Sequence, residues 1–556
     1  MLTLKNYRAS AIFLAACLVL LLLMDRDFNV FDEGFVVSNA LRVLHGDIIH
    51  RDFYSPYGPG AYYAIAALFK VFGYHVAVER IYAIAVLGAL VVIADRVALR
   101  MVSPAWAALA SGSVFVLLLG SQLYVYPSIP CIALACAATF MLTPGGVRTR
   151  PAMLLGAGAL CGLAAYFRYE TAFFVALANG AGLLSHGLMH RLSVSRVVKA
   201  VALYAIGSAA VFLPGASALS LSGFLPGFYH DIIFYPSHFY REMRGLPWPP
   251  LLNKGALLGL GAYLPFILAA VGLAEFVWIW RHRRRTDADT TLSFFVLLTT
   301  AMLYRSLVRK GLYVSVMALV PGLIVLAVCA GRWYARSRAY RFVGIGLVAL
   351  TTLVLCAPFA AILHTFRQDR SRFVLGWAAT GAGIGRKATD LYDLRCSGPS
   401  YMWPARQWIY YGAVTNFIRA HTAPDERIFV GTGRHDKIFV NPVALYASTN
   451  RLPATRWHQY DPGVQTRADV QAYMIGELSR FRPRYIVRDL AYDTMNEPNG
   501  SSRSGGVYLL DRYLDATYRP IGHSGPVQVW LRRDVAAPGL PSGRCVLDPM
   551  GYDSVR

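Results

Sequence analysis

Charged side chains are scarce in this chain. Asp, Glu, Lys and Arg make up 15% of its 556 residues, whereas hydrophobic residues make up 56% and occur in long runs. Soluble domains rarely contain repeated windows of about 18 nearly uncharged residues, which is the length of helix that crosses roughly 30 Å of hydrocarbon. The scarcity of charge therefore excludes an ordinary soluble protein and predicts a polytopic α-helical membrane protein.

About eleven segments have the length and composition of a membrane span. They are residues 8–24, 76–94, 104–120, 125–143, 151–167, 171–188, 200–216, 254–280, 290–304, 311–331 and 342–363. The first one lacks the small-residue pattern of a signal-peptide cleavage site, so we interpret it as an uncleaved anchor. Residues 59–73 form a further apolar stretch that is short for a span.

Acidic residues are rarer than basic ones: the chain has 31 Asp and Glu residues and 54 Lys and Arg residues, which gives a formal net charge of +23. The basic residues fall mainly in short loops between spans, as the positive-inside rule predicts, so they do not indicate binding to nucleic acid. With a cytoplasmic N-terminus, these basic loops all share the cytoplasmic side. The first loop (residues 25–75), the loop 217–253 and the region after residue 364 then lie outside.

Metal-ligand patterns and cysteines are also sparse. The thirteen histidines show no paired zinc spacing, so a divalent cation would depend on Asp32, Asp52 and Glu170, whose oxygens suit a hard ion if they converge. Six of the eight cysteines sit in or at predicted spans, where a thiol behaves as a small apolar group. Only Cys396 and Cys545 lie in the predicted external region. Their positions are compatible both with a disulfide between them and with two free thiols.

The composition changes near residue 390, and this divides the chain into a multi-span domain (1–389) and an external domain (390–556). The second domain is predicted to be a small α/β unit because short β-rich runs alternate there with helical patterns. The expected strands are 426–430, 484–488 and 526–531, and the expected helices are 406–420 and 467–481. The chain contains no sequence repeat of 20 to 50 residues.

An acidic pair, Asp32 and Glu33, follows the first span and precedes Gly34. Carboxylates at a membrane surface are costly unless they form ion pairs, bind a ligand or perform chemistry. Residues 34–46 predict an amphipathic helix along the interface, and residues 51–60 read Arg-Asp-Phe-Tyr-Ser-Pro-Tyr-Gly-Pro-Gly. The alternative to a functional pair is that both carboxylates cap this helix, where negative charge at the N-terminus is favourable.

This set of motifs resembles the GT-C superfamily of polyprenyl-phosphate-sugar-dependent glycosyltransferases, in particular its protein-mannosyltransferase-like and lipid A aminoarabinose-transferase-like branch. The resemblance is strongest over residues 31–73 and extends weakly along the spans and into the C-terminal domain. It implies a GT-C fold and transfer of one sugar from a polyprenyl-phosphate donor to a glycan, lipid or protein acceptor at the outer face of the membrane. The expected location is a bacterial inner membrane with a periplasmic active site.

The resemblance also implies that an acid of the first loop is the general base. A carboxylate accepts the proton of the acceptor hydroxyl as it attacks the anomeric carbon, whereas the phosphate leaves as a stable anion and needs cations. Displacement in one step inverts that carbon. Asp32 is the predicted base because it opens the match, and Glu33, about 100° further around a helix, is predicted to orient a substrate or an arginine.

Cations that bind the phosphate are predicted at two external span ends. The positive-inside rule disfavours positive charge on that side of the membrane, so these cations need a specific reason to be there. The predicted substrate-binding residues are Arg51, Asp52, Tyr54, Tyr57, Arg168, Glu170, Arg305, Arg309 and Lys310. Ordinary snorkelling is the alternative for the arginines, and a local ion pair is the alternative for Arg51 with Asp52. The segment from Arg309 to Tyr313 departs from the Arg-x-Asp-x-x-His form of some relatives, and some relatives use a divalent ion whereas others do not.

Two rival functions fit a polytopic membrane protein. A transporter or flippase of a lipid-linked sugar also needs many spans and cations near a phosphate, but such proteins commonly contain internal repeats and do not ordinarily need an acidic first loop with an external α/β domain. A membrane receptor that binds glycans is the third reading. Release of free polyprenyl phosphate from a donor would distinguish the enzyme from both.

Overall fold

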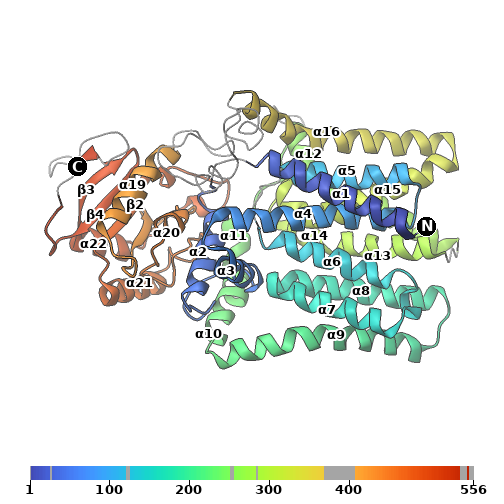
Figure 1. The fold of residues 1–556 in the computed structure, drawn as a ribbon, viewed down its shortest axis with the longest axis horizontal. Coiled ribbons are helices and arrows are strands. Elements are labelled where there is room, and N and C mark those ends of the chain that lie inside the picture. The colour runs from blue at the N-terminus through green and yellow to red at the C-terminus, as the bar shows by residue number, and fades with distance from the viewer. Residues whose placement is uncertain are drawn as a thin grey trace.

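The computed structural model describes residues 2–24, 28–120, 125–250, 256–282, 286–368, 407–538 and 548–549. A long helical bundle occupies one end of the molecule, and an α/β domain, here called the C-terminal domain, occupies the other (Figure 1). Cys396, Cys545 and the predicted domain boundary at residue 390 lie outside the described residues. The first helix begins at the end of the bundle that is remote from the C-terminal domain (Figure 1).

Each predicted span corresponds to a helix of the bundle. These helices are α1 (Leu2–Leu22), α4 (Val76–Ala98), α5 (Pro104–Gly120), α6 (Ser128–Leu142), α7 (Pro151–Phe167), α8 (Tyr169–Met189), α9 (Val194–Leu221), α12 (Ala256–Arg281), α13 (Asp287–Ala301), α15 (Val316–Arg336) and α16 (Arg338–Gln368). Within the described residues, seven helical segments are long and apolar enough to cross a membrane, and α1, α5, α6 and α7 contain shorter apolar segments. The predicted polytopic helical fold is therefore confirmed.

Burial separates the inner helices from the outer ones. Of the most apolar window of each helix, 89% is buried for α15 but only 17% for α9 and 22% for α16. The outer helices thus present apolar side chains to their surroundings, which is favourable when those surroundings are lipid. Glycines allow α7 and α9 to pack closely, because a Cβ atom at Gly158 would lie 1.9 Å from the carbonyl oxygen of Tyr204.

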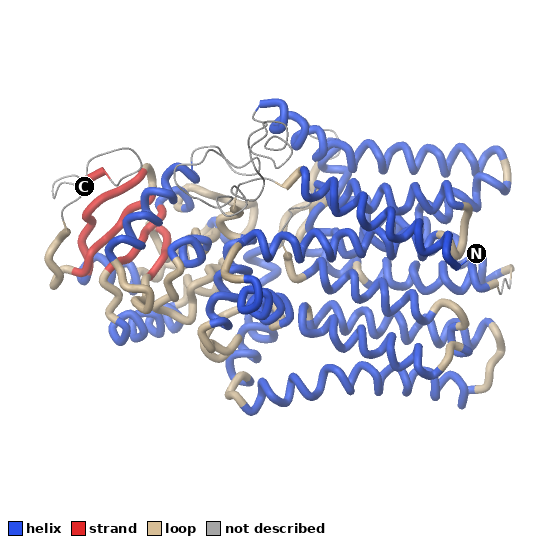
Figure 2. The backbone as a smooth tube through the Cα atoms, viewed as in Figure 1, coloured by secondary structure: helices blue, strands red, loops and turns tan. Residues whose placement is uncertain are grey.

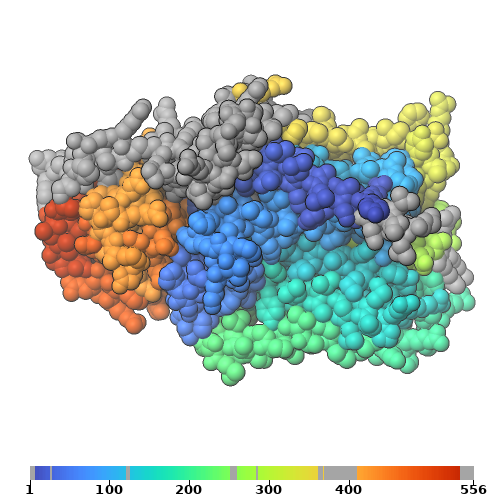
Figure 3. All heavy atoms as spheres, viewed as in Figure 1, coloured from blue at the N-terminus to red at the C-terminus, as the bar shows by residue number. Residues whose placement is uncertain are grey.

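A layer of short helices lies between the bundle and the C-terminal domain (Figures 1 and 2). It contains α2 (Asp32–Leu44), α3 (Gly60–Phe72), α10 (Leu225–Phe228), the π-helical segments η2 (Tyr229–Phe234) and η3 (Pro236–Tyr240), α11 (Arg241–Arg244) and α14 (Leu303–Val308). The helix expected at 34–46 is α2, but protein encloses it on both sides: every residue from Glu33 to Arg42 is buried. Figure 3 shows the first loop in contact with the C-terminal domain.

The C-terminal domain contains a five-stranded sheet. Its elements are α19 (Gln407–His421), β1 (Phe429–Thr432), α20 (Ala444–Thr449), α21 (Ala468–Phe481), β2 (Tyr485–Asp489), α22 (Leu509–Thr517), β3 (Tyr518–Ser524), β4 (Val527–Arg532) and β5 (Asp548–Pro549). The strand order is β1-β2-β4-β3-β5, with β1 and β2 parallel and the other pairs antiparallel. The predicted strands and helices correspond to β1, β2, β4, α19 and α21.

Strand β3 was not predicted, because apolar and polar residues do not alternate cleanly in its sequence. Its burial pattern in the structure is correspondingly irregular. It contains Pro520 and Gly522, and the pairing with β4 shifts its register between these two residues. Proline and glycine weaken a strand pattern and commonly mark such an irregularity. The strand nevertheless forms a hairpin with β4, in which Ser524 pairs with Val527 across a two-residue turn.

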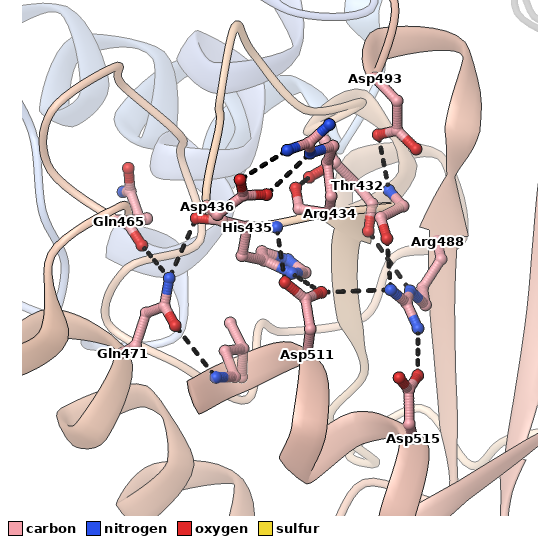
Figure 4. A network of polar contacts seen from close by, with 12 residues as sticks. Thr432, Arg434, His435, Asp436, Gln465, Gln471, Arg488, Asp493, Asp511 and Asp515 are labelled. Carbon is pink, nitrogen blue, oxygen red and sulfur yellow. Dashed lines mark hydrogen bonds and ion pairs between the residues drawn. The ribbon is translucent and has the colours of Figure 1, made fainter. Parts of the chain in front are cut away.

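A polar network closes the sheet at the carboxyl ends of β1 and β2 (Figure 4). Arg488 of β2 donates to Asp515 and Asp511 of α22 at 2.7 and 3.2 Å. The backbone amide and Nδ1 of His435 lie 2.9 and 2.8 Å from the two oxygens of Asp511. These contacts bind the loop after β1 to α22 and β2, so we assign the network to the stability of the domain.

Candidate functional site

Asp32 lies in the first turn of α2, and Asn29 fixes the start of that helix. The side-chain oxygen Oδ1 of Asn29 accepts hydrogen bonds from the backbone amides of Phe31 and Asp32 at 3.0 and 2.7 Å. Asparagine commonly stabilises a turn in this way. The half-buried carboxylate of Asp32 is therefore held at a helix N-terminus, where negative charge is favourable.

Glu33 is enclosed in a buried ion pair with Arg80 of α4. Its Oε1 accepts from Nε of Arg80 at 2.6 Å and its Oε2 accepts from Nη2 at 2.8 Å. Oε2 also accepts from the backbone amide of Asn29 at 2.9 Å. This two-pronged pair is the strong geometry for a guanidinium and a carboxylate. Glu33 thus orients an arginine, which is one of the two roles predicted for it, and it fixes α2 to α4.

Tyr126, just before α6, lies near several of the predicted site residues. Burial raises the pKa of Tyr126, the charge of Asp32 raises it further, and the charges of Arg168 and Arg305 lower it. The hydroxyl of Tyr126 is hydrogen-bonded to that of Tyr57. Asp32 and Tyr57 belong to the first loop, whereas Arg168 and Arg305 come from two distant span ends, so the fold brings predicted residues from three parts of the sequence near Tyr126.

Arg168 is buried and rigidly held at the junction of α7 and α8. Its Nη1 donates to Oγ of Ser128 at 2.8 Å, and its Nε and Nη2 donate to Oε1 of Glu170 at 2.9 and 2.6 Å. Its guanidinium carbon lies 4.9 Å from the ring centroid of Tyr57. A guanidinium fixed in this way offers a preorganised positive charge to an anion.

Arg305 of α14 differs from Arg168 in having no neutralising partner. Its buried Nε has no hydrogen-bond partner, and no carboxylate of the described residues forms an ion pair with it. Arg168 and Glu170 are nevertheless near enough to act on it electrostatically. A buried donor without an acceptor is costly, and so are two neighbouring guanidiniums. An anion between the two arginines would relieve both costs.

Tyr126 and Tyr304 were not predicted as site residues. The hydroxyl of Tyr304 lies 2.6 Å from Oγ1 of Thr171 and 3.5 Å from Oε1 of Glu170. The ring of Tyr304 stacks on Phe174 with 4.3 Å between the ring centroids. Both tyrosines stand at the ends of predicted spans, and Tyr304 also precedes Arg305, which was the available signal in the sequence.

Arg51 and Asp52 form the local ion pair that was the alternative to a substrate role. Nε and Nη2 of Arg51 lie 3.0 and 2.7 Å from the carboxylate oxygens of Asp52. Asp52 also accepts from the backbone amide of Ile48 at 2.7 Å. Tyr54 is buried and its hydroxyl donates to Asp461 of the C-terminal domain at 3.1 Å. These three residues thus shape the first loop and its contact with that domain.

Arg309 and Lys310 are engaged away from Asp32. Nη1 and Nη2 of Arg309 donate to the carboxylate of Glu497 in the C-terminal domain at 3.1 and 2.8 Å. Lys310 donates to the carbonyl of Val308 at 3.3 Å, and its Nζ lies 5.5 Å from the ring centroid of Trp248. The structure therefore separates Arg305 from the other two cations of the segment.

The part of the chain that the structure describes contains no group of three or more His, Cys, Asp or Glu side chains that could hold a metal ion. Asp32, Asp52 and Glu170, the carboxylates on which a cation would depend, do not form such a group. Asp52 and Glu170 are instead bound to the neighbouring arginines Arg51 and Arg168.

The sequence matches no family model and no curated protein. Among solved structures, ArnT from Cupriavidus metallidurans bound to undecaprenyl phosphate matches with a TM-score of 0.56 at 14% identity, over 95% of this chain and 99% of that chain. The apo structure of ArnT matches with a TM-score of 0.55 at 13% identity, over 94% and 97%. The chain has the GT-C fold. The fold expected from the first-loop motifs is thus confirmed, and the GT-C fold extends over nearly the whole chain.

Proposed function

We propose that this protein is an integral membrane glycosyltransferase that moves one sugar from a polyprenyl-phosphate donor to an acceptor hydroxyl. The observation that carries the proposal is the convergence of Asp32, Arg168 and Arg305 on Tyr126. A carboxylate and two guanidiniums that act on the same tyrosine would supply a base and an anion site. The GT-C fold supports the proposal further, since the matching ArnT structure is described as bound to undecaprenyl phosphate.

In the proposed reaction, the acceptor oxygen forms a bond to the anomeric carbon while the bond between that carbon and the phosphate oxygen breaks. Asp32 accepts the hydroxyl proton, which as general-base catalysis contributes about 10²–10⁴-fold. The phosphate leaves with the bonding electron pair and is stabilised by Arg168 and Arg305. Attack opposite the leaving group inverts the sugar carbon. Glu33 does not take part, because its two oxygens already bind Arg80 and Asn29.

We propose that the site faces the periplasm of a bacterial inner membrane, with the N-terminus in the cytoplasm. The distribution of basic loops supports this orientation. The helical bundle would then hold the lipid phosphate. The C-terminal domain would lie outside and bound the acceptor side of the site, because it packs on α2 directly after Asp32. The acceptor is a glycan, a lipid or a protein.

The test is transfer by the purified protein in detergent or nanodiscs, supplied with a panel of undecaprenyl-phosphate sugars and an extract of cell-envelope acceptors. We expect acceptor-dependent release of undecaprenyl phosphate from the wild type. Asp32→Asn, which keeps the size of the side chain but removes the base, should lower kcat by about 10²-fold or more without loss of insertion.

Two results would contradict the proposal. Wild-type turnover in the Asp32→Asn variant would show that Asp32 is not the general base. Movement of an intact lipid-linked sugar across the bilayer without release of undecaprenyl phosphate would show that the protein acts as a flippase and not as a glycosyltransferase. Glu170→Gln is the matched control for removal of one carboxylate at the site, and it is expected to leave the chemical step in place, because Glu170 is the ion-pair partner of Arg168 and not the proposed base.

A further inference from the structure

Glu79 in the first turn of α4 is a buried carboxyl group with an unusual set of neighbours. Its side chain accepts a hydrogen bond from the backbone amide of Val125 through Oε1. Its other oxygen, Oε2, is buried and has no hydrogen-bond partner. Glu33 lies near enough to interact with it. A carboxyl group in such surroundings is expensive to bury, so its retention calls for a specific reason.

The neighbours of Glu79 and Arg80 are adjacent in sequence to two residues of the site. Arg80 binds Glu33, which follows Asp32, and Glu79 binds the amide of Val125, which precedes Tyr126. Asp32 and Tyr126 are therefore tied to the same turn of α4. That turn fixes how far apart the two side chains are.

We propose that Glu79 is a positioning residue for the sugar transfer: it holds the segment of Tyr126 against α4 while its neighbour Arg80 holds Glu33, the residue that follows Asp32. Glu79 does not touch the substrate, and its role rests on the proposed function because the geometry that it fixes is that of the general base. Without its carboxyl oxygen, the buried amide of Val125 would have no acceptor, and the segment would move to find one.

The orphan oxygen of Glu79 suggests which substitutions preserve the role. Two carboxyl groups can approach each other only if a proton lies between them, because carboxylate oxygens are acceptors alone. The amide of glutamine reproduces this arrangement: its oxygen can accept from Val125 and its NH₂ group can donate to Glu33. Glu79→Gln should thus retain the geometry, whereas Glu79→Ala removes the acceptor of the Val125 amide and Glu79→Asp shortens the reach to it.

The experiment compares these three variants in the undecaprenyl phosphate release assay and in direct binding of undecaprenyl phosphate. We expect Glu79→Ala and Glu79→Asp to lower kcat by about 10–100-fold, because small displacements of a catalytic group are costly. Affinity for undecaprenyl phosphate should stay within about twofold, since Glu170 also holds Arg168 and Arg305 lies on α14. Glu79→Gln should keep a kcat within about threefold of the wild type.

Wild-type kcat in Glu79→Ala and Glu79→Asp would overturn the positioning role. Equal loss of kcat in Glu79→Gln and Glu79→Ala would overturn it as well, because the amide should rescue the geometry. If Glu79→Ala does not fold, the comparison of Glu79→Gln with Glu79→Asp decides. Failure of the proposed function is recognised separately, since the wild type itself would then release no undecaprenyl phosphate from any donor.

Discussion

Arg305 and Arg309 lie four residues apart, but only Arg309 is neutralised by a carboxylate, that of Glu497. Arg305→Gln should weaken binding of undecaprenyl phosphate by about 10–100-fold, because a charge-assisted hydrogen bond contributes about 1.5–3 kcal/mol. Arg309→Gln should leave this affinity within about twofold, since its charge is already bound. Titration of undecaprenyl phosphate into the solubilised variants measures both. Equal losses in the two variants would refute the assignment of the phosphate to Arg305.

The sequence predicted residue types more reliably than residue roles. Asp32, Arg168 and Arg305 were selected as charges that a membrane surface tolerates only for a reason, and the fold does bring them together around Tyr126. The same criterion selected Arg309, whose reason is the ion pair with Glu497. A carboxylate 188 residues away in the sequence decides between a binding and a structural role, and no local pattern contains that information.

At the scale of elements, Gly34 lets α2 approach the start of α20. A Cβ atom at this position would lie 2.7, 2.8 and 2.9 Å from three atoms of Ala444. The backbone amide of Ala444 donates to the carbonyl of Val30 at 2.9 Å, so the neighbour is not free to retreat. Gly34 therefore acts through space rather than through backbone freedom.

Substitution of Gly34 by Val should destabilise the protein by about 1–3 kcal/mol, because an overpacked contact forces the elements apart. The matched control is Gly112→Ala in α5, where a Cβ atom would meet nothing within 4 Å. That change should be neutral or stabilising by up to about 1 kcal/mol, since alanine favours a helix. Thermal unfolding in detergent measures both variants. A Gly34→Val melting temperature equal to that of the wild type would show that α2 and α20 separate freely.

The spans were predictable as elements because length and apolar composition suffice to define a helix in lipid. The surroundings of α2, in contrast, could not be predicted from its sequence. Its pattern predicted an interfacial helix with one wet side, yet Ser38 donates to the carbonyl of Val443 at 3.0 Å and the whole stretch from Glu33 to Arg42 is buried. The polar side of α2 faces the C-terminal domain instead of water, which an amphipathic pattern cannot distinguish.

At the scale of the whole molecule, buried polar contacts join the first loop, the loop 217–253 and the C-terminal domain. Asp231 accepts from Nη2 of Arg456 at 3.0 Å and lies 2.9 Å from Nδ1 of His50. Arg42 donates to the carbonyl of Thr455 at 3.0 Å. Because these groups would be unpaired if the domain moved away, the three parts are expected to stay together as one unit.

His458 makes this assembly sensitive to pH. Its Nε2 lies 2.8 Å from Oδ1 of Asn39, and its Nδ1 lies 3.3 Å from Nη1 of Arg42. The arginine can only donate and the Asn39 oxygen can only accept, so His458 is neutral with its proton on Nε2. Burial, followed by the charge of Arg42, holds the pKa of His458 well below its ordinary value of 6.5.

A histidine with a lowered pKa in the folded state binds its proton more readily when the chain unfolds. Its contribution to stability is therefore complete above about pH 6.5 and declines as the pH falls below that value. We expect the melting temperature of the solubilised protein to decrease between pH 7 and pH 5, and His458→Gln, which cannot titrate, to show a smaller decrease. His523→Gln, which changes an exposed histidine contact on β3, is the control and should retain the wild-type slope. Identical slopes for His458→Gln and the wild type would exclude His458 as the source of the pH dependence and would place the titrating group elsewhere in the assembly.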